Sequence, residues 1–338
     1  MVPAQDDDDD EELVEIPAES LPENIMGFAI ASFIRDFHAQ AVDRSAKHTG
    51  LRGVRVSVVL FVVACTWSLQ FYIVYATKQL VTPPLVQAIR TAYSDFQNLT
   101  YRDDDGTPHL VHSKYGGVRG IPGHYNHNHF QALSAEEQEQ VCKISLSQPW
   151  FIFTLLFIWG IAVTESLRST IVLMLRLLLP SATKWKEDMR ESVEVNGDTM
   201  TVKSLPTCVK FAFCWFLFLP KLLVTFVLLW LGCRFLVATM SFGDVLRNAV
   251  ALTFILGIPE LMFRVLVPMR GRLETTQTHV RSVFSRERAN VFTYFGTFSL
   301  LFVVGLWVVL YMTWIQDVLP QYNWDVHITC DDYLSHLR

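Results

Sequence analysis

The sequence lacks the short motifs that mark the common enzyme classes. It contains no GxSxG nucleophile elbow, no HExxH zinc-protease motif and no phosphate-binding Walker loop. It also contains no CxxC pair and no Cys/His box of the kind that holds zinc. We therefore expect no catalytic residues, no cofactor and no metal site. An enzyme is the class that the sequence supports least, and an intramembrane enzyme is kept as a third, weaker alternative.

The sequence also lacks an excess of positive charge. The net charge is -5 and no strongly basic face is evident, so we expect no nucleic-acid partner. The start of the chain is acidic, from Asp6 to Glu12, where a signal peptide would be basic. The first hydrophobic helix is therefore expected to act as the insertion signal and to stay in the protein. Residues 1–23 are expected to form a disordered acidic tail.

Hydrophobic residues are abundant, at 51% of the chain, and they occur in blocks long enough to cross a hydrocarbon core of about 30 Å. The sequence therefore predicts an all-α polytopic membrane protein. It would have about four full transmembrane helices, one broken or re-entrant helical segment, a surface amphipathic helix and a small cytoplasmic β-hairpin. The predicted order is an acidic tail (1–23), an amphipathic cytoplasmic helix (24–50), a first span (51–77), an extracytoplasmic loop (78–147), a second span with a cytoplasmic extension (148–180), a cytoplasmic hairpin and linker (181–208), a third span (209–240), a broken membrane segment (241–268), a basic cytoplasmic linker (269–290), a last span (291–315) and an extracytoplasmic tail (316–338).

The orientation follows from the distribution of basic residues. Arg52 and Arg55 precede the first span, with Arg44 and Lys47 before them, which places that end in the cytoplasm by the positive-inside rule. Residues 269–290 carry five arginines against two glutamates, so this stretch is also expected to be cytoplasmic. The broken segment would then have to cross, which gives a cytoplasmic N-terminus and an extracytoplasmic C-terminus in a plasma membrane or endomembrane. If the segment only dipped into the bilayer, the basic stretch would lie outside.

The cysteines test this layout. Four of the six lie in or beside spans and are interpreted as apolar packing residues: Cys65, Cys208, Cys214 and Cys233. Cys142 and Cys330 are the two that fall in regions placed outside. A disulfide between them would tie the large loop to the C-terminal tail in an oxidising compartment, and two free thiols are the alternative.

The extracytoplasmic loop has two further features. Asn98 begins the sequon Asn98-Leu99-Thr100, a candidate glycan site that agrees with the orientation. The loop also holds several histidines, for which a metal or proton-sensing role is one interpretation. We favour a solvated loop rich in turn residues instead. The five histidines are His109, His112, His124, His127 and His129.

Local patterns predict three smaller elements. Ile25, Phe28 and Phe33 fall at helical spacing, which favours an amphipathic helix. This helix could lie on the membrane surface or against a partner protein. It could equally pack against the cytosolic part of the same chain. An Asn196-Gly197 turn between short apolar alternations predicts the β-hairpin. Ser241, followed by Asp244, predicts a helix N-terminus of the capping-box type.

Two charged residues are the candidate polar pathway. The third span is expected to be interrupted at Pro220-Lys221. Lys221 lies about eleven residues after Lys210, or roughly 16 Å along a helix, which is close to mid-membrane. Glu260 follows Pro259 in the broken segment. Intramembrane charges beside disrupted backbone often form ion and substrate sites, so these two could line or gate a pathway. The alternative is an ion pair within the bundle, between the two or between Glu260 and Arg264.

The stretch from Asn248 to Phe263, NAVALTFILGIPELMF, resembles a segment of uncharacterised multi-pass membrane proteins of unicellular algae and other protists. In those proteins a similar apolar run ends in an acidic residue, at the position that Glu260 takes in this sequence. This chain differs at Gly257-Ile258-Pro259, where the family more often has an acidic residue and no proline. The resemblance implies an acidic membrane site but no particular activity.

These features favour a channel or transporter subunit, working as a homo- or hetero-oligomer among membrane lipids, because five crossings enclose little volume. The alternative is a structural or scaffolding membrane protein in a larger complex. It would hold partners through its glycan-bearing loop, acidic tail and basic linker.

Overall fold

The computed structural model of the chain describes residues 14–15, 18–42, 49–113, 117–179, 193–280, 286–287 and 291–336. The acidic run, Arg44, Lys47 and part of the basic linker lie outside the described residues. The chain divides into two compact units. The first unit comprises Met1–Ser68, Leu167–Leu222 and Ile258–Phe302, and the second comprises Leu69–Ser166, Leu223–Gly257 and Val303–Arg338.

Four helices among the described residues are long and apolar enough to cross a membrane. Between 22% and 39% of the most apolar window of each is buried inside the protein, so most of each apolar surface faces outward. Large exposed apolar faces of this kind are stable in lipid and not in water. The expected class, an all-α polytopic membrane protein, is confirmed. The four helical stretches are Gly50–Thr100, Pro149–Leu178, Thr207–Ala238 and Phe298–Ile315.

The first of these stretches is a continuous helix of 51 residues. It is built from α2 (Thr49–Ala76), a π-helical turn (η2, Thr77–Val81) and α3 (Thr82–Thr100). At 1.5 Å per residue it is about 75 Å long, more than twice the thickness of the hydrocarbon core. Two prolines follow the π turn in the first turn of α3, where a missing N–H is tolerated. The chain therefore continues as helix into the region expected to be a loop.

The other spans also contain π turns. The second span is α6 (Pro149–Leu178), and the last is α13 (Val291–Leu310) with η5 (Tyr311–Ile315). The third consists of α8 (Thr207–Phe213), η4 (Cys214–Phe218) and α9 (Leu219–Ala238). We expected an interruption at Pro220, but the helix continues through it. The π turn just before the proline changes the hydrogen-bond register, which accommodates a residue that has no N–H to donate.

The broken segment is present as a bent helix pair. Helix α10 (Phe242–Leu256) and helix α11 (Ile258–Leu266) meet at Gly257 with a bend of 51°. The capping box that was predicted at the start of α10 does not form, so this prediction is wrong. The side chain of Ser241 makes no capping hydrogen bond, and Asp244 instead pairs with Arg247 at 2.9 Å.

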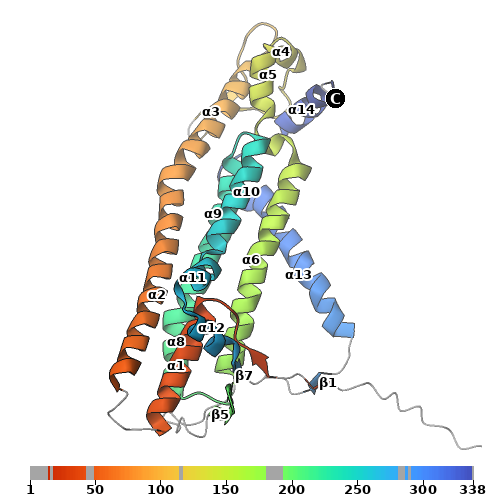
Figure 1. The fold of residues 1–338 in the computed structure, drawn as a ribbon. Helices are drawn as coiled ribbons and strands as arrows, with labels where there is room; N and C mark the ends of the chain where they lie inside the picture. The colour runs from red at the N-terminus through yellow and green to blue at the C-terminus, as the bar shows by residue number, and fades with distance from the viewer. Residues whose placement is uncertain are drawn as a thin grey trace, which may run out of the picture. The chain divides into compact units, whose positions relative to one another are not determined.

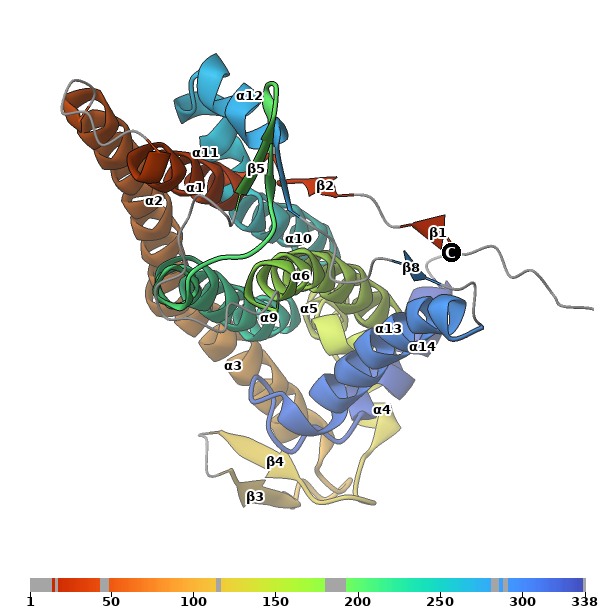
Figure 2. The same ribbon diagram turned by 90° about the horizontal axis from the view of Figure 1, so that it is seen from below.

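In the first unit, α1 (Ile25–Val42) packs against α11 and α12 (Met269–Thr276), as Figure 1 and Figure 2 show. Most of the first half of α1 is buried, so the helix packs on the protein itself, one of the placements expected from the sequence. Beside it lies a four-stranded sheet with the order β2-β7-β6-β5. Its strands are β2 (Glu19–Ser20), β7 (Thr278–Val280), β6 (Thr199–Val202) and β5 (Val193–Asn196).

The predicted hairpin is confirmed within this sheet. Asn196 pairs with Thr199, which leaves Gly197 and Asp198 as the two-residue loop. Gly197 has a φ of 61°, a conformation that favours glycine at the first loop position. The hairpin is not isolated, because β6 runs parallel to β7, and β2 pairs antiparallel with β7. The remaining short strands of the expected tail and linker, β1 (Val14–Glu15) and β8 (Arg286–Glu287), pair with each other.

In the second unit, residues 82–113 and 117–147 fold together with the described part of the C-terminal tail. Helix α3 packs against β4, α4 and α5, and α14 packs against α5 and η3. The expected loop is therefore a folded domain, named the outer domain after the position expected from the sequence, and Figure 2 shows its β3–β4 hairpin. Its core includes Val86, Ile89, Tyr93 and Phe96, spaced three and four residues apart on one face of α3. The other elements are β3 (Leu110–His112), β4 (Val118–Gly120), α4 (His127–Gln131), α5 (Ala135–Cys142), η3 (Ser145–Ser147) and α14 (Asp325–His336).

Candidate functional site

The two charged residues expected within the membrane lie within electrostatic reach of each other, both in the first unit. Lys221 is 5% exposed in the first turn of α9, and Glu260 is half-buried in the first turn of α11. The Glu260 carboxylate acts electrostatically on the Lys221 ammonium. Because opposite charges reduce each other's desolvation cost, proximity explains how both are tolerated among apolar helices.

The Glu260 carboxylate is only partly satisfied. Its Oε2 atom is buried and has no hydrogen-bond partner. A buried carboxylate oxygen normally accepts at least one hydrogen bond, so an orphaned one marks a place where a proton or a cation can bind. Arg264, the other candidate partner for Glu260, has an exposed side chain one turn further along α11. Of the two candidate partners, Lys221 is the one whose charge the Glu260 carboxylate acts on.

The backbone around this pair is disrupted on both sides. Lys221 follows a π turn and Pro220, and Glu260 follows Gly257 and Pro259. Each proline removes a backbone donor from its helix. Irregular helix backbone beside a charge is a common component of ion sites in membranes.

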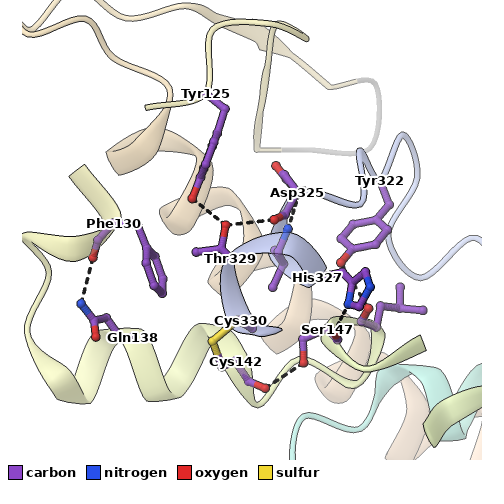
Figure 3. The surroundings of a disulfide bond; sticks show 12 residues. Tyr125, Phe130, Gln138, Cys142, Ser147, Tyr322, Asp325, His327, Thr329 and Cys330 are labelled. Atoms are coloured by element: carbon purple, nitrogen blue, oxygen red, sulfur yellow. Dashed lines mark hydrogen bonds between the residues drawn. A yellow bond between two sulfur atoms is a disulfide. The ribbon is translucent and has the colours of Figure 1, made fainter. Parts of the chain in front are cut away.

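The expected disulfide is present in the outer domain. Cys142, at the end of α5, is bonded to Cys330 in α14, with the two Cα atoms 5.4 Å apart (Figure 3). Both half-cystines are buried. The Ser147 hydroxyl donates to the Cys142 carbonyl at 2.9 Å, and His327 contacts the Ser147 carbonyl at the same distance. The bridge and these bonds fasten the C-terminal helix to α5 and η3.

A second group of contacts around α14 centres on Asp325, which the sequence did not single out. Its carboxylate accepts hydrogen bonds from Tyr93 at 3.0 Å, Gln97 at 3.0 Å and Tyr101 at 2.9 Å, although Asp325 is only 8% exposed. Burial and the nearby Asp325 charge raise the pKa of Tyr101, so its phenol keeps its proton and remains a donor. The Arg119 guanidinium lies over the Tyr93 ring, 4.9 Å from its centroid. These contacts make α14 an integral part of the outer domain.

A basic groove of about 690 Å³ also lies in the second unit. It is lined along α3 by Arg90 and on α9 by Arg234, with Lys78 at the π turn. Arg90 donates to the Val318 carbonyl at 2.9 Å, and Arg234 pairs with Asp317 at 3.4 Å. With Asp95 as the acidic lining residue, the groove keeps a net positive charge, which suits an anionic group.

In the first unit, a charged cluster joins α1, α2 and α12. Arg55 contacts Asp36 at 3.2 Å and Glu274 at 3.3 Å, and Arg270 contacts Glu274 at 3.0 Å. Burial raises the pKa of Asp36 above its ordinary value of 3.8, against the opposing attraction of Arg55. The cluster anchors the N-terminal helix to the start of the first span.

The remaining sequence candidates lie in the outer domain. Asn98 is exposed on α3, and its side-chain oxygen accepts from Arg102 at 3.1 Å. The structure also brings Asp103, His109 and His124 together, with ligand-capable atoms within 4.8 Å of one another. The sequence reasoning missed this group because it sought ligands at fixed spacing. A signal was present, since His109 and His124 flank a short hairpin and Asp103 lies just before it.

Comparisons of the chain with protein-family models, with curated proteins and with solved structures find no match in any of the three. The function therefore has to be inferred from the residues of this chain.

Proposed function

We propose that the protein is an ion channel or transporter subunit, with a polar site formed by Lys221 and Glu260. The observation that carries this proposal is the buried, unpartnered Oε2 of Glu260 near Lys221. A purely structural ion pair is most stable when every polar atom is satisfied, because each orphaned atom keeps its desolvation cost. An acceptor left open between disrupted helices is suited to bind a proton or cation transiently.

The membrane topology proposed with this function has five crossings. The disulfide requires Cys142 and Cys330 to be in one compartment. Three uninterrupted spans separate them, and an odd number of crossings would leave the cysteines on opposite sides. The bent pair α10–α11 therefore supplies a fourth crossing, which supports a traversing rather than a re-entrant segment. Glu260 then belongs to a helix that passes through the bilayer.

The proposed orientation has the N-terminus in the cytoplasm and the C-terminus outside. Arg55 at the start of α2 and Arg270 after α11 support it through the positive-inside rule. The disulfide supports it as well, because such bonds persist in oxidising compartments. Asn98 is exposed and would be available for glycosylation on that side. Expression in a eukaryotic cell should give an endoglycosidase-sensitive band that Asn98→Gln abolishes, and an insensitive wild type would reverse the orientation.

The proposed assembly is an oligomer surrounded by lipid. Five crossings enclose too little volume for a wide pore, so a conducting path would form beside or between subunits. The last span has the most outward-facing apolar surface, with 22% of its window buried, which leaves it available for lipid or for a second subunit.

The test is transport by the purified full chain. We expect planar bilayers in KCl, or proteoliposomes with a potassium and proton gradient, to show current or flux above protein-free membranes. Glu260→Gln and Lys221→Met should each reduce it at least about tenfold, since they remove charge at the site. Glu165→Gln is the matched control, because Glu165 is an exposed carboxylate in α6 and should leave transport unchanged.

A double variant separates transport from structure. If the pair is only structural, each single substitution lowers stability and Lys221→Met combined with Glu260→Gln recovers it, because no uncompensated buried charge remains. Transport that is absent in the wild type, or unchanged in both single variants, would overturn the proposal.

The alternative function is a structural or scaffolding membrane protein. The observation that favours it is the outer domain itself, which is closed by a disulfide and by the bonds to buried Asp325. Such a rigid outer surface is suited to hold another protein. Purification in a stable stoichiometric complex, together with no transport, would support this alternative.

A further inference from the structure

Three potential metal ligands converge at one edge of the outer domain. Asp103, His109 and His124 each offer one ligand atom, and these atoms all lie within 4.8 Å of one another. His109 Nε2 is 2.7 Å from Asp103 Oδ2. The imidazole rings of His109 and His124 stack, with centroids 4.1 Å apart and planes 18° apart. Two imidazoles and a carboxylate therefore bring their ligand atoms close together.

The backbone holds each of these residues in place. The Asp103 N–H donates to the Thr107 carbonyl at 3.1 Å, and the Asp103 carbonyl accepts from Gly106 at 2.8 Å, which closes a turn. The His109 N–H donates to the Tyr101 carbonyl, and the His109 carbonyl accepts from Ile121, each at 3.0 Å.

His124 and the Asp103 side chain are fixed in a similar way. His124 donates from its backbone to Ile121 at 3.2 Å, after Gly123 with a φ of 92°. The Thr107 hydroxyl donates to the Asp103 carboxylate at 3.2 Å and so orients it. Because these restraints act before any ion binds, ordering the backbone of the site costs little entropy.

The donor set determines which ions fit. Imidazole nitrogen suits zinc, copper, iron and nickel, whereas calcium and magnesium prefer oxygen ligands alone. Zinc binds nitrogen at about 2.0–2.1 Å and carboxylate oxygen at about 2.0–2.2 Å, so tetrahedral ligands lie roughly 3.4 Å apart. The 2.7 Å contact between His109 and Asp103 would have to open slightly, and the wider separations would have to close. Side-chain rotation suffices for both, since Asp103 and His124 are exposed.

The exposed setting leaves room for a further ligand. Two histidines and one carboxylate occupy three tetrahedral positions, and water or another group can take the fourth. A second carboxylate and imidazole are close by, with Asp104 and His129 3.9 Å apart. An ordinary surface ion pair would need only His109 and Asp103. It would not explain why the His124 imidazole stacks on the His109 imidazole.

We propose that Asp103, His109 and His124 form a binding site for a divalent transition-metal ion, and that zinc is the ion that fits it best. The site lies in the outer domain and is independent of the proposed transport function. Its location has a structural consequence, because His109 is hydrogen-bonded to the Tyr101 backbone and Tyr101 binds Asp325. A bound ion would stabilise the hairpin that helps to hold the C-terminal helix.

The test uses the full chain in detergent, purified with a tag that contains no histidine and stripped with EDTA. Titration with zinc chloride, followed by calorimetry, should give about one ion per chain. Cobalt should bind with the visible absorption of a tetrahedral complex, and calcium should not compete. Zinc should also raise the thermal midpoint in proportion to its occupancy.

Variants locate the site. His109→Ala, His124→Ala and Asp103→Asn should each weaken zinc binding by at least about tenfold, the smallest loss typical when even an outer-shell partner is removed. His112→Ala is the matched control, because His112 is an exposed histidine of the same hairpin and lies outside the group. The thermal midpoints of the metal-free variants show whether each still folds.

Three results would overturn the proposal. They are no zinc binding by the folded wild type, binding that the three substitutions leave unchanged, or calcium binding as tight as zinc binding.

Discussion

The phenol of Tyr101 donates a hydrogen bond of 2.9 Å to the carboxylate of Asp325, which lies 224 residues further along the chain. Tyr93 and Gln97 donate to the same carboxylate from one face of α3. The outer end of the first long helix is thus bound directly to the first residue of the last helix. A buried carboxylate with three side-chain donors also concentrates stability at one residue, because its loss leaves the Tyr93 and Tyr101 phenols without their acceptor and removes one of the two acceptors of Gln97.

Asp325→Ala should lower the free energy of unfolding of the outer domain by about 3 kcal/mol or more, since several buried donors lose their partner at about 1–3 kcal/mol each. Tryptophan fluorescence during thermal or denaturant unfolding in detergent measures the change. Asp331→Ala is the control, because Asp331 is exposed in the same helix and should change stability by no more than about 0.5 kcal/mol. Equal effects of the two substitutions would contradict the role assigned to Asp325.

Removing the disulfide should also destabilise the outer domain. Cys142→Ser with Cys330→Ser should cost about 2–5 kcal/mol, because the bridge restricts the unfolded chain over a separation of 188 residues. Non-reducing electrophoresis should show a mobility shift on reduction in the wild type and none in the double variant. Cys208→Ser is the control, as an exposed free thiol whose loss should leave both mobility and stability unchanged.

Asp36 should make stability depend on pH. Its pKa is raised in the folded protein, mainly by burial, so the folded state binds the proton more tightly than the unfolded chain. The stabilisation from this proton is fully present below the ordinary pKa of 3.8 and is lost as the pH rises through the folded value. The stability of the wild type relative to Asp36→Asn should therefore increase as the pH falls from 7 towards about 4.

A second substitution checks the cause of this pH dependence. Arg55 opposes the shift by attracting the Asp36 charge at 3.2 Å. In an Arg55→Met background, the folded pKa of Asp36 should rise further, because burial then acts without this attraction. The pH-dependent stability change that Asp36→Asn removes should therefore begin at higher pH in that background than in the wild type. Thermal unfolding across a pH series measures both, and a difference that does not vary with pH in either background would remove the explanation by burial.

Two glycines should respond in opposite directions to alanine. A Cβ atom at Gly232 would lie 2.6 Å from Cε2 of Trp159, which is buried. Gly232→Ala should cost about 1–3 kcal/mol through overpacking of α9 against α6. Gly296 in α13 has no atom within 4 Å of its added Cβ, so Gly296→Ala should be neutral or stabilise by up to about 1 kcal/mol. Thermal midpoints that fall equally for both variants would argue against this packing.

Several features followed from the sequence because they depend on neighbours along the chain. Apolar runs long enough for a bilayer predicted the spans, and the glycine and proline at Gly257 and Pro259 predicted the bend between α10 and α11. The alternation around Gly197 predicted the hairpin. The pairing of Cys142 with Cys330 followed from topology, since these two cysteines were the ones placed outside.

The sequence rules failed at three places. Ser241 has the residue type of a helix cap but makes no capping bond, and Asp244 pairs with Arg247 within the same helix. Pro220 was expected to interrupt its span, yet a π turn absorbs it. The region expected to be a loop is a folded domain. Helix α3 has polar residues on one face and buried residues on the other, and the buried face became evident only from the elements that pack against it.

The sequence by itself determined that the chain has spans for a membrane, that the segment around Gly257 bends, and which two cysteines were candidates to pair, because hydrophobic length and backbone chemistry are properties of local sequence. The tertiary structure alone decided that Asp325 binds Tyr93 and Tyr101, and that Asp103, His109 and His124 meet. These contacts join turns and helices that are distant in sequence or separated by a hairpin, and no periodicity along the chain records which side chains such folding brings together.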